Sequence, residues 1–260
     1  MQKRNTAKKI IIGNWKMNPS SAKVAEKLFF SVTKLISGIR RTEVVVCPPF
    51  LYIDRLKSAS RRAKKISIGA QDSFGVDIGA FTGKVSPEML YNIGARYVIL
   101  GHSERRALGE SNIDVNKKIK GVLYTGLVPI LCVGERDRDD NHEYFNIVKI
   151  QIEECLNGIS KNSLSKIIIA YEPIWAISTT PNQRDATPTD CEEMVIFIKK
   201  TLADKFGART ILPRIIYGGS VNEKDAKDFL LRGSVDGLLA GRASLNAKKF
   251  TKIINIAENI

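Results

Sequence analysis

Residues 167–173 read IIIAYEP, an apolar run and a tyrosine that end on an acid, Glu172, with a proline directly after it. A strand that is apolar at every position, and not only at alternate ones, is typical of a parallel sheet buried on both faces. Glu172 therefore stands at the carboxyl end of a predicted buried strand. The polar segment 178–187, which follows soon after, is predicted to be a loop.

Seven other short runs rich in β-branched residues repeat this pattern, at 9–13, 43–47, 66–70, 97–101, 128–134, 214–219 and 236–241. Most are separated by amphipathic stretches in which apolar residues recur at spacings of three and four, which favours helices. The stretch 189–207 is predicted to begin at Thr189, with Glu192 completing a capping box. Eight strands alternating with helices predict the α/β class and a (β/α)8 barrel, a fold of about 250 residues.

The domain organisation is predicted to be simple. No linker, low-complexity tract or shift in composition divides the 260 residues, so one barrel domain over residues 1–260 is expected. The composition, 43% hydrophobic and 26% charged, is typical of a globular protein. No apolar run approaches the roughly 18 residues of a membrane span, and Ile10–Ile12 is too short for a signal peptide. A cytoplasmic location without membrane contact is therefore predicted.

The cysteines and histidines do not indicate a metal site. Four cysteines, at positions 47, 132, 155 and 191, have no CxxC spacing, and the chain has only two histidines. A Cys/His zinc site would have almost no ligands to draw on. The cysteines are interpreted as structural thiols in a reducing compartment.

The net charge of +14 raises nucleic acid as a partner, but the distribution of the charge argues against it. The basic residues form scattered doublets, such as Arg40-Arg41, Lys117-Lys118 and Lys248-Lys249, mostly within or beside predicted helices. A nucleic-acid module more typically gathers its charge on one face or interleaves it with aromatic residues. No nucleic-acid partner is predicted, whereas a field of this sign would attract a small anionic substrate.

The residues that follow the strands are where a barrel builds its active site. The chain places polar or glycine-rich groups there: Asn14-Trp15-Lys16, His102-Ser103-Glu104, Glu172, Gly218-Gly219-Ser220 and Gly241-Arg242. The last two groups follow the final two strands, where barrels commonly bind phosphate through backbone N–H groups. One glycine pair is more often a structural turn, but two such turns in this place favour a phosphate site.

His102 directly precedes SERRALG (103–109), a predicted helix with Ser103 as its possible N-cap. Because a helix N-terminus disfavours positive charge, the imidazole is expected to be neutral and to donate a hydrogen bond. The second histidine, His142, lies in a polar run and is expected to be exposed.

We expect a different role for each of the residues Lys16, Glu104 and Glu172 beside His102. The Lys16 ammonium would stabilise negative charge that develops on oxygen, and Glu104 could hold it in place. Glu172 could take a proton from a carbon beside a carbonyl, which gives an enediolate. A phosphorylated enediolate readily loses its phosphate in water, so Pro173-Ile174-Trp175 is interpreted as the stiff hinge of a covering lid.

These features belong to a series of motifs that resembles the triosephosphate isomerase family over nearly the whole chain. The motifs are GNWKMN (13–18), CPPF (47–50), GAQD (69–72), AFTGKVSPEML (80–90), YVILGHSERR (97–106), GESN (109–112), PILCVGE (129–135), AYEPIWAI (170–177), YGGSV (217–221) and LLAGRASL (238–245). The resemblance implies a TIM barrel that interconverts dihydroxyacetone phosphate and D-glyceraldehyde 3-phosphate, with no cofactor or metal.

The resemblance also implies a role for each motif residue. Glu172 would be the base, His102 the neutral electrophile, and Lys16 a catalytic and substrate-binding cation supported by Glu104. The remaining substrate contacts would be Asn14, Ser178, Ser220, Gly241 and Arg242, the phosphate being held by backbone N–H groups. Members of the family are usually homodimers, in which the loop around Thr82 reaches into the partner's site.

The chain departs from the family's common pattern at several positions. The lid, between Ile177 and Ala186, is about three residues longer, and Ser178 stands where a glycine is usual. Arg242 replaces a glycine after the last strand, although its backbone N–H remains. Near the expected dimer contact, Lys84 replaces an acid and Asp72 an asparagine.

Three other functions compete with this one. Another phosphate-binding barrel enzyme would not need the combination of Lys16, His102 and Glu172. A catalytically silent barrel, kept as a basic binding protein, would be expected to have lost one of them. A nucleic-acid-binding side role rests on the charge alone.

Overall fold

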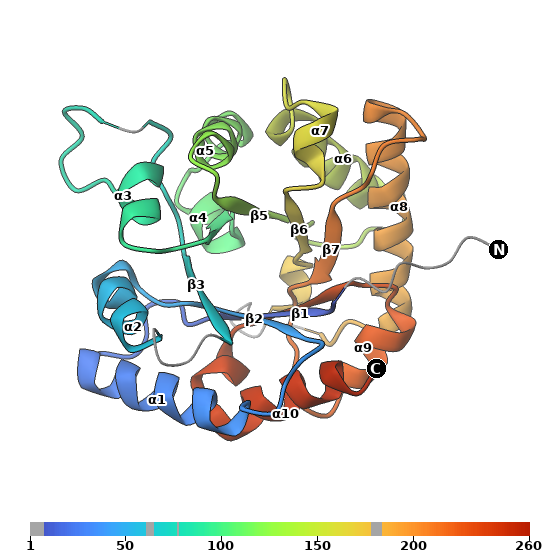
Figure 1. Ribbon diagram of the computed structural model, residues 1–260. Helices are drawn as coiled ribbons and strands as arrows, with labels where there is room; N and C mark the ends of the chain where they lie inside the picture. Colours follow the sequence, from blue (N-terminus) through green and yellow to red (C-terminus); the bar gives the residue numbers. More distant parts are fainter. Residues whose placement is uncertain (1–7, 61–64, 77, 178–183) are drawn as a thin grey trace.

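The computed structural model describes residues 8–60, 65–76, 78–177 and 184–260, and its strands form a closed, parallel barrel (Figure 1). The strands are β1 Ile10–Asn14, β2 Glu43–Cys47, β3 Ile66–Ala70, β4 Tyr97–Leu100, β5 Val128–Val133, β6 Ile168–Tyr171, β7 Arg214–Tyr217 and β8 Gly237–Ala240. Each pairs with the next, and β1 pairs with β8 in the register Ile10↔Gly237. The predicted (β/α)8 barrel is thereby confirmed, with strand ends within two residues of the predicted runs.

Helices surround the strands in Figure 1, so that the sheet is covered from outside. They are α1 Ala22–Leu35, α2 Ile53–Ser60, α3 Pro87–Asn92, α4 Ser103–Ala107, α5 Asn112–Tyr124, α6 Glu143–Cys155, α7 Lys161–Leu164, α8 Pro188–Phe206, α9 Ala226–Arg232 and α10 Ala247–Glu258. Short 3-10 turns cover Phe50–Tyr52, Ile174–Ala176 and Arg242–Leu245. None of the helices in the described ranges is long and apolar enough to cross a bilayer.

Two apolar cores explain why the strands are apolar at every position. Alternate strand residues, including Ile12, Val45, Ile99 and Ile168, fill the barrel interior. The others face the helices in the larger, outer core. Burying an aliphatic side chain stabilises a fold by roughly 1.5–3 kcal/mol, so both faces of each strand contribute.

The start of α8 differs from the prediction. The N-cap is Thr187, whose hydroxyl accepts a hydrogen bond from the N–H of Asp190 at 3.2 Å, and Asp190 completes the capping box. Thr189 and Glu192 do not cap the helix. The reason is Pro188, which fits the first helical position because its φ is already helical and the N–H it lacks would have no partner there.

Three polar residues that begin their strands close the floor of the barrel. The Arg214 guanidinium contacts the Glu43 carboxylate at 2.7 Å, and the Tyr97 hydroxyl donates to the same carboxylate. Burial, together with the Glu43 charge, raises the pKa of Tyr97, which keeps its hydroxyl protonated. The end of the barrel opposite the strand tips is therefore sealed by a satisfied polar cluster.

Glu258, the last residue of α10, joins the end of the chain to the segment that precedes β2. Its carboxylate accepts hydrogen bonds from the backbone N–H groups of Arg40, Arg41 and Thr42, at 2.8–3.0 Å. Burial opposes its ionisation, but these amide bonds outweigh burial and lower its pKa. The end of α10 is thus fastened to the segment between α1 and β2.

We expect Glu258→Gln to lower the stability at pH 7 by about 1 kcal/mol, because the amides lose a charged acceptor. A carboxyl with a lowered pKa stabilises the fold above its unfolded pKa of about 4.3, and this contribution disappears as the pH falls through the folded pKa. Thermal unfolding followed by circular dichroism should therefore show a melting deficit at pH 7 that is smaller at pH 3. A deficit of equal size at both values would contradict the charge argument. Glu153→Gln is the matched control, because the Glu153 side chain on α6 makes no hydrogen bond or ion pair with the described residues.

Candidate active site

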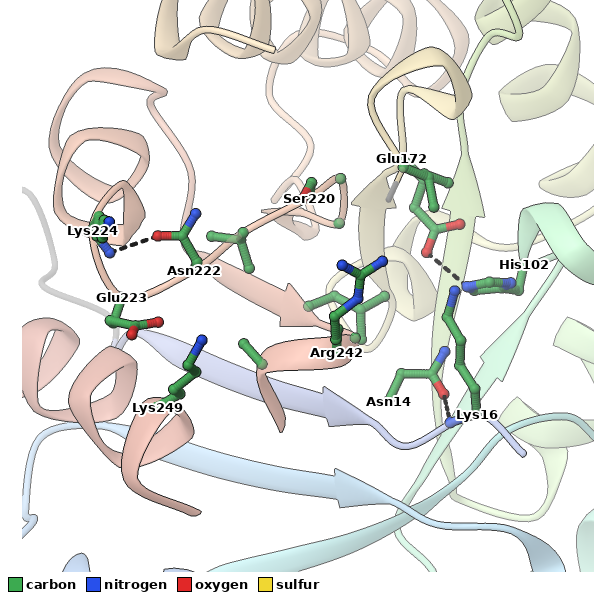
Figure 2. A pocket seen from close by; sticks show the side chains of 17 residues that line it. Asn14, Lys16, His102, Glu172, Ser220, Asn222, Glu223, Lys224, Arg242 and Lys249 are labelled. Carbon is green, nitrogen blue, oxygen red and sulfur yellow. Dashed lines mark hydrogen bonds and ion pairs between the residues drawn. The ribbon is translucent and has the colours of Figure 1, made fainter. Parts of the chain in front are cut away.

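A cavity of about 350 Å³ opens at the carboxyl ends of the strands, and most of the predicted site residues line it (Figure 2). Those that do are Asn14, Lys16, His102, Glu172, Ser220, Gly241 and Arg242. Glu104 does not line the cavity but contacts Lys16. Ser178 lies outside the described residues. The barrel has thus brought together groups that are far apart in sequence.

Glu172 is a buried carboxylate, only 2% exposed, at the tip of β6. Its Oε1 lies 3.4 Å from Nε2 of His102, and its Oε2 lies 3.5 Å from the backbone N of Ser103. Its own backbone N–H donates to the carbonyl of Val133 in the neighbouring strand. The Cys132 thiol beside Glu172 stays neutral, because burial and, as the second cause, the Glu172 charge raise its pKa. The acid is therefore fixed in place and faces an imidazole.

The imidazole of His102 has a defined hydrogen-bonding state. Its Nδ1 accepts a hydrogen bond from the backbone N–H of Glu104 at 3.2 Å, so His102 and not Ser103 is the N-cap of α4. The predicted cap was wrong by one residue, because the imidazole itself supplies the acceptor. A neutral ring that accepts at Nδ1 carries its proton on Nε2. Nε2 lies on the cavity side, 3.4 Å from Glu172 Oε1.

Lys16 adopts an unusual backbone conformation, with φ of +52°. Left-handed geometry costs a non-glycine residue about 1–2 kcal/mol and persists where the surroundings impose it. The Lys16 N–H donates to Asn14 Oδ1 at 3.0 Å, and Gln71 Nε2 donates to the Lys16 carbonyl at 2.8 Å and to the Cys47 carbonyl at 2.9 Å. The ammonium contacts Glu104 at 2.7 Å. Backbone strain is thus used to direct a cation into the cavity.

Gln71 was not selected as a site residue from the sequence. In the structure its amide holds the Lys16 segment by hydrogen bonds to two backbone carbonyls. Its position directly after a buried strand does place it among the residues where a barrel builds its active site. Its amide, however, contacts backbone and not substrate groups, and such a role leaves no chemical pattern in a sequence.

The glycine-rich turn after β7 is shaped by close contacts. A Cβ at position 218 would lie 2.8 Å from Glu172 Cγ, and one at position 219 would lie 2.3 Å from the Tyr217 hydroxyl. The Ser220 backbone N–H, predicted to hold phosphate, donates here to the Ala176 carbonyl at 3.1 Å. The turn therefore leaves space for the Glu172 side chain, and the Ser220 amide is already hydrogen-bonded.

A second buried carboxylate, Glu135, bonds to residues on either side of Glu172. Glu135 is fully buried, and it accepts hydrogen bonds from the Tyr171 hydroxyl and Trp175 Nε1, both at 2.8 Å. The Arg138 guanidinium lies 3.3 Å from the same carboxylate. The Arg184 guanidinium lies over the Trp175 ring, 4.4 Å from the ring centre, so the segment before α8 contacts the turn Ile174–Ala176. Sequence reasoning missed Glu135, because a buried acid looks like a surface acid in a sequence.

The two departures near the expected dimer contact are satisfied within the chain. Asp72 lies 3.0 Å from Arg105 and 2.7 Å from Lys118, and the Lys84 ammonium lies 5.7 Å from the centre of the Phe74 ring. His142 is exposed, as predicted, and lies away from the cavity at the start of α6.

Comparisons with known proteins agree with this geometry. A family model described as triosephosphate isomerase matches residues 9–257. Proteins named triosephosphate isomerase from Moorella thermoacetica and Caldanaerobacter subterraneus are each 41% identical to the chain, over 95% of it and over 97% and 98% of their own lengths. The crystal structure of triosephosphate isomerase from Bartonella henselae superposes with a TM-score of 0.82 at 33% identity, covering 96% of this chain and 98% of that one. Because these matches span almost the entire length and not the cavity alone, the chain belongs to the triosephosphate isomerase family.

Proposed function

We propose that this chain interconverts dihydroxyacetone phosphate and D-glyceraldehyde 3-phosphate, with Glu172 as the base. The observation that carries the proposal is the 3.4 Å approach of the Glu172 carboxylate to His102 Nε2 in a cavity that also holds Lys16. A base, a neutral hydrogen-bond donor and a cation that converge on one small space are what proton transfer beside a carbonyl requires.

The mechanism follows from where each group lies. Glu172 removes a proton from C1 of dihydroxyacetone phosphate, and the electron pair moves into the C1–C2 bond to give the enediolate. His102 Nε2–H and the Lys16 ammonium stabilise the charge on the oxygens, which exchange a proton through the imidazole. Glu172 then returns its proton to C2, and C1 becomes the aldehyde. No atom is gained or lost.

The phosphate is assigned to the other part of the cavity. Gly241, Arg242 and Ser220 line this space. The Ser220 N–H binds phosphate once its bond to the Ala176 carbonyl opens, which moves the hinge turn Ile174–Ala176. Ser178, proposed to add a further amide, lies outside the described residues.

Glu172→Gln tests the base directly. An amide cannot accept the proton from carbon, so we expect kcat to fall by about 10²–10⁴-fold, the usual contribution of a general base. A coupled assay of glyceraldehyde 3-phosphate isomerisation measures it. Binding of inorganic phosphate should be little changed, which separates lost chemistry from a lost fold. Activity within tenfold of the parent protein would rule out Glu172 as the base.

Arg242→Ala tests whether the guanidinium contributes to phosphate binding. We expect KM for either triose phosphate to rise about three- to tenfold at low salt, and the difference to shrink at 0.5 M salt because partly exposed charges are screened. Steady-state kinetics at several ionic strengths, with kcat followed separately, supplies the answer. An unchanged KM at every salt concentration would assign the phosphate to backbone groups alone.

We further propose that the active form is a homodimer. Large apolar side chains are exposed on the segments that follow β1 and β2 and on the connection between β3 and α3, which projects from the barrel in Figure 1. Met17 is 93% exposed, Leu51 and Ile78 are each 85% exposed, and Phe81 is 47% exposed. Exposed apolar clusters of this kind are typical of protein interfaces.

Ile78→Asp should convert the dimer to a monomer and lower activity, because an acid cannot be buried without a partner. Sedimentation velocity measures the first effect and the coupled assay the second. The matched control is Ile196→Asp, which changes a 60% exposed residue on α8. If the parent protein sediments as a monomer at micromolar concentration and is fully active, the proposal is wrong.

The cysteines support a reducing compartment. All four are buried and unpaired, and burial raises the pKa of each thiol. Unpaired structural thiols are usual in the cytosol, and the cytoplasmic location stays a prediction that cell fractionation tests.

A further inference from the structure

The cavity continues past the phosphate end into a basic rim that the isomerase reaction does not use. Its lining includes Glu223 and Lys224, from the loop before α9, and Lys249, from the first turn of α10. Figure 2 shows these residues on one side of Arg242, with Lys16, His102 and Glu172 on the other. A three-carbon monophosphate needs only the inner part.

The charges of this rim favour a second anion. Lys224, Lys249 and Arg242 supply three cations, and Glu223 is the one carboxylate among the rim residues just named. A concave wall with an excess of one sign raises the local concentration of ligands of opposite charge. The Arg242 guanidinium lies between the inner and outer parts in Figure 2, where it can serve phosphoryl groups on either side.

One rim cation, Lys249, stands against the preference of its helix, and the loop that carries Lys224 is rigid. Helix α10 has no acid in its first turn and carries Lys249 there, although a helix N-terminus favours negative charge. The loop is held rigidly, because Asn222 Oδ1 accepts from the Lys224 N–H at 2.8 Å and the Asn222 N–H donates to Asp225 at 2.8 Å. Positions that break a local rule in an otherwise consistent fold are often functional.

We propose that this rim is a second anion subsite, and that the cavity binds small molecules with two phosphoryl groups. One phosphoryl group occupies the place proposed for the triose phosphate, at Gly241 and Ser220, and the other lies against Lys224 and Lys249. Such a compound competes with substrate. The subsite rests on the proposed function only in the position of the first phosphoryl group.

The test is direct binding, which needs no turnover. Isothermal titration calorimetry compares α,ω-alkanediol bisphosphates of two, four and six carbons with the matching alkyl monophosphates. We expect at least one bisphosphate to bind ten or more times tighter than its monophosphate. A ratio within the statistical factor of two for every chain length would overturn the proposal, because two equivalent phosphates in one site give no more than that.

Three variants assign the effect to the rim. Lys249→Ala should lower the bisphosphate-to-monophosphate ratio by roughly fivefold, the upper range for a partly exposed charge, and leave monophosphate binding unchanged. Lys248→Ala is the matched control, since it removes an exposed neighbouring lysine that does not line the cavity. Glu223→Gln should raise the ratio, because it removes the opposing charge. Equal effects of Lys249→Ala and Lys248→Ala would show that only general charge attracts the second phosphate, which also overturns the proposal.

The two proposals fail in different ways. A protein that lacks isomerase activity but keeps the bisphosphate preference refutes the reaction and leaves the subsite standing. A protein that isomerises triose phosphates and shows no preference refutes the subsite alone.

Discussion

The pairing of β1 with β8 is the constraint on which the rest of the structure depends. Without it the eight strands would form an open sheet with two exposed edges, and the first and last strand ends would not meet. The closing contact is tight: a Cβ at position 237 would lie 1.9 Å from the Ile10 carbonyl oxygen, so only glycine fits there. Because this seam is closed, Lys16 after β1 and Gly241 after β8 share one cavity with Glu172 after β6.

The carboxylates at the two ends of the barrel differ in how closely they are hydrogen-bonded. At the floor, Glu43 is paired with Arg214 and bonded to Tyr97, so that its charge is satisfied within the fold. At the mouth, Glu172 faces His102 and the Ser103 backbone N–H only at 3.4–3.5 Å, longer than good hydrogen bonds. A carboxylate that is buried but loosely bonded is available for proton transfer, whereas a fully bonded one is not. The satisfied charge at the floor and the acid proposed as the base are thus separated along the barrel axis.

The sequence predicted most of the fold and the gathering of three polar site residues around one cavity, for physical reasons. Strands buried on both faces are apolar throughout, and barrel geometry then places every strand tip at one mouth, which is why Lys16, His102 and Glu172 were found together. Positions decided by one local contact were not predicted. Thr187 caps α8 because Pro188 occupies the first helical position, and His102 caps α4 with its own ring. Gln71 and Glu135 support their neighbours through contacts that no periodicity records.

The hydrogen bond from Ser220 N–H to the Ala176 carbonyl has a consequence for product release. If a phosphate takes this amide, the protein gives up one bond to make another, and only the difference between the two contributes to affinity. The Ala176 carbonyl would therefore compete with the phosphate for the Ser220 amide. Such an exchange keeps the amide satisfied in the empty site, so that no unpaired donor has to be held ready in the turn. If Ser220 holds the phosphate as proposed, the exchange would also limit how tightly either triose phosphate is held and would help each isomer to leave.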